Sequence, residues 1–92
     1  MSLIYTYNKK VIQIEETKNE SDFEFDIKFI EDKYMAGMKQ IQKGFEENKV
    51  YTDVLFYPYD SHHYRIIVRQ DYYVDFVLAL LKHQLLVSVE WS

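Results

Sequence analysis

The sequence predicts an α+β fold in which strands and helices follow the order β-α-β-β-α-β. Two segments alternate apolar and polar residues, which is typical of strands with one buried face. Two others repeat apolar residues every three or four positions, as amphipathic helices do. Between the two helices lie two runs of aromatic and β-branched residues separated by turn residues, which predicts a hairpin. The expected elements are strand 23–29, helix 32–48, strand 51–57, strand 64–69, helix 71–84 and strand 85–91.

The first and last of these strands have the clearest alternation. Each presents four apolar residues on one face and, apart from Leu86, charged or polar residues on the other, so one face is expected to be buried and the other wet. The apolar residues are Phe23, Phe25, Ile27 and Phe29 in the first strand, and Leu85, Val87, Val89 and Trp91 in the last.

The first helix is predicted by apolar residues at spacings of four, three and four: Tyr34, Met38, Ile41 and Phe45. Two glycines, Gly37 and Gly44, lie seven residues apart and therefore on one side of this helix. They either let the helix approach the sheet closely or weaken it by up to about 1 kcal/mol each relative to alanine.

The central hairpin is expected to turn at Pro58–His62. Proline has no backbone N–H to donate to a ladder, so strand 51–57 should end before it. The residues that follow have turn chemistry, and strand 64–69 should return antiparallel. The second helix then has apolar positions Tyr72, Tyr73, Phe76, Val77, Leu80 and Leu81.

This order is the split βαβ arrangement of ferredoxin-like folds. Right-handed crossovers place both helices on one face of the sheet. In this topology strands 23–29 and 64–69 pair antiparallel at the centre. On the outer face, Glu24, Asp26 and Lys28 then lie near Arg65 and Arg69, so opposite charges can meet across the strands.

The N-terminal residues are expected to form an additional β-hairpin from the strand-like runs 3–7 and 11–14. The polar segment 15–22 reads as a solvated connection. The whole chain, 1–92, is expected to be one domain, with 1–18 as the hairpin extension and 22–92 as the α+β core.

Composition excludes several classes of function. A net charge of −4 without a basic run disfavours nucleic-acid binding. The chain has no cysteine, which excludes disulfides and thiol nucleophiles and makes the cytoplasm the expected location. No apolar run approaches the roughly 18 residues that a membrane span needs, so no membrane partner is expected.

The sequence predicts no catalytic, cofactor-binding or metal-binding residue. His62 and His63 follow Asp60 and Ser61, which are residue types found in metal sites and hydrolase triads. Neighbours in an extended chain point to opposite faces, however, so an ordinary polar hairpin loop is the preferred interpretation. Specific RNA binding is also disfavoured, because the outward positions of the central strands carry no aromatic platform.

The outer sheet face is the candidate interaction surface. It has too many apolar residues to be left wholly exposed to solvent and too many charged residues to be part of a dry core. The N-terminal hairpin, a second copy, another protein or a ligand would cover it; alternatively it is an ordinary solvated face. Its candidate residues are Tyr51, Leu55, Tyr57, Arg65, Ile67, Arg69 and Leu86.

These observations predict a small, non-enzymatic cytoplasmic protein that acts as an interaction or regulatory module. It would associate as a homodimer or with a protein partner, through the outer sheet face or an edge strand. The alternative is a small-ligand binder or an enzyme with a cleft near Tyr57, Arg65, Arg69 and the His62–His63 loop.

Overall fold

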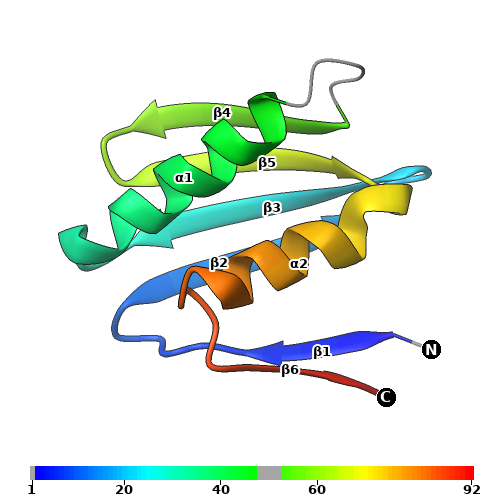
Figure 1. The fold of residues 1–92 in the computed structure, drawn as a ribbon, viewed down its shortest axis with the longest axis horizontal. Coiled ribbons are helices and arrows are strands. Elements are labelled where there is room, and N and C mark those ends of the chain that lie inside the picture. Colours follow the sequence, from blue (N-terminus) through cyan, green and yellow to red (C-terminus); the bar gives the residue numbers. More distant parts are fainter. Residues whose placement is uncertain (1, 48–52) are drawn as a thin grey trace.

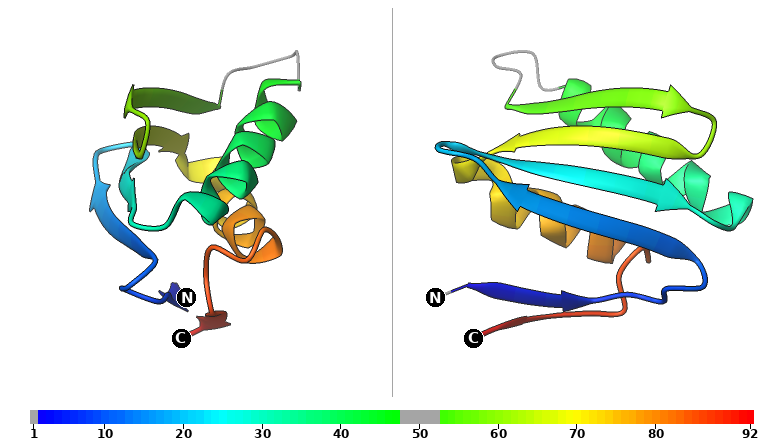
Figure 2. Two further views of the ribbon diagram at one scale, coloured as in Figure 1. Left: turned by 90° about the vertical axis from the view of Figure 1, so that its left-hand side faces the viewer. Right: turned by 180° about the vertical axis from the view of Figure 1, so that it is seen from behind.

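The computed structural model describes residues 2–47 and 53–92. These residues form two helices and six strands in two antiparallel sheets, with both helices on one face of the larger sheet (Figure 1 and Figure 2). The α+β class is confirmed, and the arrangement is consistent with a small ferredoxin-like fold. The strands are β1 (Leu3–Thr6), β2 (Ile12–Lys18), β3 (Asp22–Phe29), β4 (Val54–Asp60), β5 (His63–Arg69) and β6 (Ser88–Trp91); the helices are α1 (Met35–Glu46) and α2 (Tyr73–Lys82), each preceded by a single 3₁₀ turn.

The centre of the larger sheet is the predicted pair. Its strand order is β2-β3-β5-β4, and β3 pairs antiparallel with β5 from Asp22↔Arg69 to Lys28↔His63. The alternation in β3 puts Phe25 and Ile27 toward the helices, where both are fully buried. The apolar spacing therefore predicted correctly both the central pairing and the face that the helices cover.

The N-terminal hairpin prediction is wrong. β2 pairs with β3, and β1 pairs with β6 in a separate two-stranded sheet, which we call the terminal ribbon. The polar segment expected to be a connection instead continues β2 to Lys18, and the chain turns between Asn19 and Ser21, where the Asn19 N–H donates to the Asp22 carbonyl (2.8 Å). Polar side chains do not prevent this pairing, because the hydrogen bonds of the ladder join backbone N–H and C=O groups, which every residue except proline has.

The last strand also pairs differently from the prediction. β2 occupies the place beside β3 that the last strand was expected to take. The chain after α2 turns away from the larger sheet at Gln84, whose φ of 64° lies in the left-handed region. Leu85 and Leu86 are both buried in this connection, so the alternation of a strand begins only at Ser88. Leu86 therefore belongs to the core and not to the outer sheet face, which corrects its assignment.

Strand β4 does not end at Pro58. It continues to Asp60 and pairs with β5 through an irregularity between Pro58 and Asp60. β4 is an edge strand, and an edge tolerates a proline because one side of the strand needs no donors. The predicted turn is accordingly shortened to Ser61 and His62.

Phe76 of α2 lies at the centre of the core. Its ring centroid is 4.8 Å from that of Phe25, 6.2 Å from that of Phe45 and 6.3 Å from that of Phe56. One side chain thus joins α2 to β3, α1 and β4. Because Phe76 is fully buried, it contributes strongly to the packing of both helices on the sheet.

The two glycines of α1 have different surroundings. A Cβ on Gly37 would lie 3.3 Å from the Cβ and the carbonyl oxygen of His83, whereas a Cβ on Gly44 would meet nothing within 4 Å. Gly37 therefore lets α1 approach the end of α2, and Gly44 only lowers the helix propensity. At Gly37, α1 therefore approaches α2 closely, and not the sheet, as one of the two interpretations of the glycines predicted.

We expect Gly44→Ala to raise the free energy of unfolding by about 0.5–1 kcal/mol, because alanine loses less backbone entropy in a helix. Gly37→Ala should gain less or destabilise, since its methyl group crowds the His83 backbone. Urea titration of both variants measures the difference. Equal stabilisation by the two substitutions would contradict the close approach at Gly37.

The terminal ribbon lies beside β2 (Figure 1). Tyrosine side chains attach it to β2. The Tyr5 hydroxyl donates to Glu16 Oε1 (2.8 Å), and the Tyr7 hydroxyl donates to the Ile14 carbonyl (3.1 Å). Tyr73 of α2 donates to the same Glu16 carboxylate (3.0 Å). One carboxylate on β2 therefore ties the ribbon and α2 together.

Candidate functional site

Five of the seven residues predicted for the interaction surface lie together on the outer sheet face. Leu55, Tyr57, Arg65, Ile67 and Arg69 lie on the side of the sheet opposite the helices, with Leu55 paired to Ile67 and Tyr57 paired to Arg65. Leu86 is buried elsewhere, as described above, and Tyr51 lies outside the described residues. Leu55 and Ile67 are only half-buried, and no N-terminal hairpin lies over them.

Opposite charges on this face meet across the strands as expected. Arg65 Nε lies 3.4 Å from Glu24 Oε1, and Arg69 Nε lies 3.8 Å from Asp53 Oδ1. His63 contacts Asp26 through Nε2. The face thus largely balances its own charges, which leaves less net charge to attract a partner.

Arg65 has the least satisfied polar atom on this face. Its guanidinium carbon lies 5.0 Å from the centroid of the Tyr59 ring, and its Nε is buried without a hydrogen bond within the described part of the chain. A buried donor without a partner is costly. The Glu24 carboxylate, 3.4 Å away, partly compensates this donor, and its burial keeps it out of reach of a ligand.

The two histidines of the loop do not converge. His62 contacts Asp32 at the start of the first helical turn and Ser61 Oγ, whereas His63 contacts Asp26 of β3. No group of three or more metal-ligating side chains occurs among residues 2–47 and 53–92. The two rings therefore have separate carboxylate partners.

Two cavities lie at the ends of the outer face. One of about 410 Å³ is bounded by Lys28, Asp60, His62 and His63, and one of about 290 Å³ by Asp53, Leu55, Ile67 and Arg69. These are the places where the alternative prediction located a cleft. Both are within or close to the size range of small-molecule sites, but neither has the mostly apolar lining that such sites usually have.

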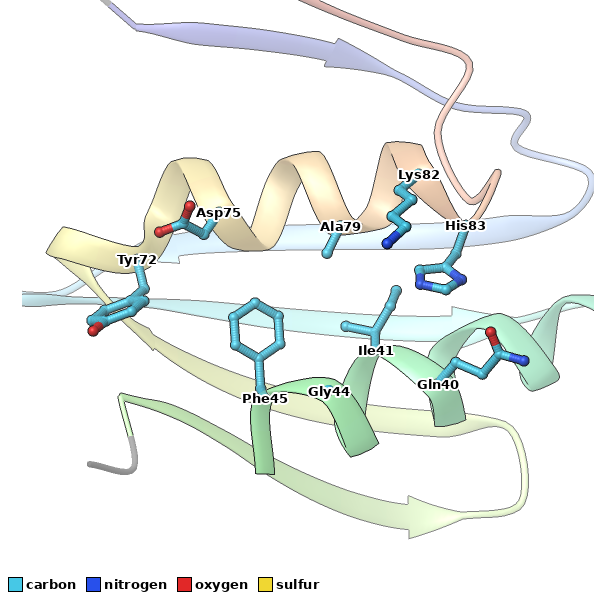
Figure 3. A pocket seen from close by; sticks show the side chains of 9 residues that line it. All are labelled: Gln40, Ile41, Gly44, Phe45, Tyr72, Asp75, Ala79, Lys82 and His83. Atoms are coloured by element: carbon cyan, nitrogen blue, oxygen red, sulfur yellow. The ribbon is translucent and has the colours of Figure 1, made fainter. Parts of the chain in front are cut away.

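A third cavity, of about 380 Å³, separates the two helices (Figure 3). Ile41, Phe45 and Ala79 line its middle, with Lys82 and His83 toward one end and Tyr72 and Asp75 toward the other. It opens where Gly44 leaves space and closes where Gly37 meets His83. The sequence did not predict this cavity. The spacing of seven residues between Gly37 and Gly44 cannot show that only Gly37 is in contact with the other helix.

A group of exposed apolar side chains lies on α2 and the terminal ribbon, and sequence reasoning missed it. Val74, Leu78 and Leu81 follow one another at helical spacing on a side of α2 that does not face the sheet, and Leu78 is 47% exposed. Trp91 of β6 is 57% exposed and lines a cavity of about 470 Å³ together with Val74. We call Val74, Leu78, Leu81, Val89 and Trp91 the α2–β6 surface.

A second apolar stripe on α2 was the available signal for this surface. The inward side of the helix is buried through Phe76, Val77 and Leu80, so Val74 and Leu78 are apolar residues that the core does not use. A surface helix normally carries polar residues there, and a helix that is apolar on several sides is normally covered on each. The predicted apolar positions of this helix left out Val74 and Leu78, so the second stripe was not recognised.

The α2–β6 surface borders an open strand edge. The strands from β4 to β6 curve around α2, and β6 is outermost, with β1 between it and β2 (Figure 1; Figure 2, left). β6 pairs with β1, and no other described strand pairs with it. An apolar helix stripe and an unpaired strand edge thus lie side by side, which is a combination that proteins usually protect.

No helix in the described part of the chain is long and apolar enough to cross a membrane. Comparison with protein-family models, with curated proteins and with solved structures found no match to this chain.

Proposed function

We propose that this protein is a non-enzymatic interaction module that acts by association through its α2–β6 surface. The observation that carries the proposal is the exposed apolar stripe of α2 beside the open edge of β6. Burying Leu78 and Trp91 would remove apolar area from water, and the β6 edge would supply backbone hydrogen bonds. A cytoplasmic location is part of the proposal and is supported by a chain without cysteine.

The outer sheet face supports association less well, although it is the surface that the sequence predicts. Arg65, Arg69 and His63 already contact carboxylates of the same face. A partner would have to replace or desolvate these pairs, and desolvating a charged pair often costs as much as its contacts return. The edge-strand form of the interaction hypothesis therefore has the stronger support.

The test compares two lysine substitutions with the same change in charge. Leu78→Lys places a charge in the α2–β6 surface, and Thr17→Lys places one on the outer sheet face at an exposed position of β2. By sedimentation velocity across a concentration series, we expect the wild type and Thr17→Lys to associate alike. Leu78→Lys should raise the dissociation constant by about tenfold or more, which corresponds to about 1.4 kcal/mol of lost apolar burial.

A wild-type chain that stays strictly monomeric at millimolar concentration would remove most of the case for self-association. If association persists but Leu78→Lys and Thr17→Lys change it equally, the contact lies elsewhere. Circular dichroism of both variants shows that the fold is retained.

A small-ligand site near Arg65, Arg69 and the His62–His63 loop remains a second candidate function. The cavities beside Arg69 and beside the His62–His63 loop favour it. It requires that a small anion raise the melting temperature of the wild type and not that of Arg69→Met, because Arg69 is the cation that lines one of these cavities. Equal effects on both chains would contradict it.

A further inference from the structure

The terminal ribbon contains only β1 and β6 and is open along β6. A two-stranded antiparallel unit is marginally stable in water, and three or more strands are normally needed. Packing of Leu3, Tyr5 and Val89 against the core supports one face of this ribbon, but it gives the outer edge no hydrogen-bonding partner.

The register of the ribbon identifies the backbone groups on the open edge. Ser2 and Ser92 exchange backbone hydrogen bonds. The Ser92 nitrogen lies 2.9 Å from the Ser2 carbonyl oxygen, and the Ser2 nitrogen lies 3.4 Å from the Ser92 carbonyl oxygen. Hydrogen-bonded pairs alternate along an antiparallel ladder, so Ile4↔Glu90 is also such a pair, and Leu3↔Trp91 and Tyr5↔Val89 are not. The N–H and C=O groups of Val89 and Trp91 therefore point away from β1.

We propose that a second copy of this chain pairs antiparallel with β6 about a two-fold axis at Val89. The two ribbons then form one four-stranded sheet in the order β1-β6-β6-β1. This inference rests on the proposed function, since it names the partner and the register for the same α2–β6 surface. A two-fold interface uses the same patch on both copies, as an edge that is paired with itself requires.

The residues around Val89 suit this register. Val89 lies opposite Val89 of the second copy, and Ser88 opposite Glu90. Val87 lies opposite Trp91 at the end of the ladder; because its N–H already donates to the Thr6 carbonyl (2.8 Å), this pair contributes mainly side-chain contact. Val87 is 69% and Trp91 57% exposed, so the pairing places together the two most exposed large apolar side chains of residues 2–47 and 53–92. The alternative register centred on Glu90 would oppose two carboxylates, which is unfavourable.

The same pairing covers the apolar stripe of α2. The sheet curves around this helix, so a strand added beyond β6 continues the curve toward the side of α2 that carries Val74 and Leu78 (Figure 2, left). Val74 and Trp91 already line one cavity, which shows that the stripe faces the ribbon. Apolar residues of the second copy's β6 would fill that space.

The test uses the absence of natural cysteine, which makes an introduced thiol the only one in the chain. Val89→Cys places two thiols opposite each other across the two-fold axis, at a Cα separation of about 5.5 Å that a disulfide spans. Ile4→Cys is the control, on the other strand of the same ribbon. Ile4 is 46% exposed and Val89 is half-buried, so random collision would favour the control.

With oxidised glutathione as the oxidant, we expect Val89→Cys to form a covalent dimer at least about five times faster than Ile4→Cys, because pairing raises the effective concentration of the thiols. A mixture of Ser88→Cys and Glu90→Cys should give the mixed dimer in preference to either symmetric one. Both positions are exposed, so this second pair of variants keeps the test valid if Val89→Cys folds poorly.

Faster cross-linking of Ile4→Cys, or a statistical mixture of Ser88→Cys and Glu90→Cys dimers, would overturn the edge pairing. If Leu78→Lys still abolishes association in that case, the α2–β6 surface remains the contact and only the register and strand pairing are wrong. If the wild type does not associate at all and neither pair of variants shows a preference, the proposed function and this inference both fail.

Discussion

Replacement of Phe76 by alanine should lower the free energy of unfolding by about 3–5 kcal/mol, the usual cost of removing a large buried aromatic side chain. Phe76 is fully buried and contacts rings from β3, α1 and β4, so the cavity it leaves cannot close without moving several elements. A chain of 92 residues has modest stability, and this loss could leave it largely unfolded. Urea titration followed by circular dichroism measures the change.

Leu78→Ala is the matched control, two residues along the same helix. Leu78 is 47% exposed, so its truncation should change the stability of the monomer by about 0.5 kcal/mol or less. A large effect at Leu78 in dilute solution would show that the α2 stripe belongs to the monomer core, and it would weaken the proposed association surface. A small effect at Phe76 would contradict the observed packing of α2.

Replacement of Glu16 by alanine should destabilise the protein by about 1–2 kcal/mol, and mainly at the terminal ribbon. The change removes the acceptor of two phenol hydrogen bonds, from Tyr5 and Tyr73. The value is at the low end for hydrogen bonds to a charged group because Glu16 is exposed. Hydrogen exchange should show faster opening of β1 and β6 than of β3 and β5.

Glu15→Ala is the control for this variant, because Glu15 is the neighbouring residue on the outer side of β2. Its removal should leave the exchange of β1 and β6 unchanged. Equal exchange in the two variants would mean that apolar packing alone holds the ribbon.

The same contact makes the stability sensitive to alkaline pH. Burial, and next the hydrogen bond to Glu16, raise the pKa of both Tyr5 and Tyr73 above the ordinary value of 10.0. The folded chain therefore keeps these protons when the unfolded chain begins to lose them, so their contribution is complete below pH 10 and falls as the pH rises above it. In Glu16→Ala this fall should be shallower, since one cause of the raised pKa is gone.

The candidate site was only partly predictable. Alternation showed that Leu55, Arg65, Ile67 and Arg69 share the outer face, because the side-chain direction along a strand has a period of two. The expected pairing of β3 with β5 also predicted that opposite charges would meet across these strands, as Arg65 and Glu24 do. It did not predict the contact of Arg69 with Asp53, which lies just before β4. The α2–β6 surface was missed because an apolar residue in a helix looks the same in the sequence whether it faces the core or solvent.

The sequence by itself determined the faces of the elements. The periods in β3, α1, β5 and α2 specified which residues are buried, and they led to the central β3–β5 pair with both helices on one side. The tertiary structure alone decided which strand lies beside β3 and where both termini lie. Two segments with suitable apolar residues compete for that edge. The nearer one, β2, directly precedes β3 and is joined to it by a turn of three residues, so its loop costs less entropy to close. β1 and β6 are then left to pair with each other, and their open edge is a consequence of that choice.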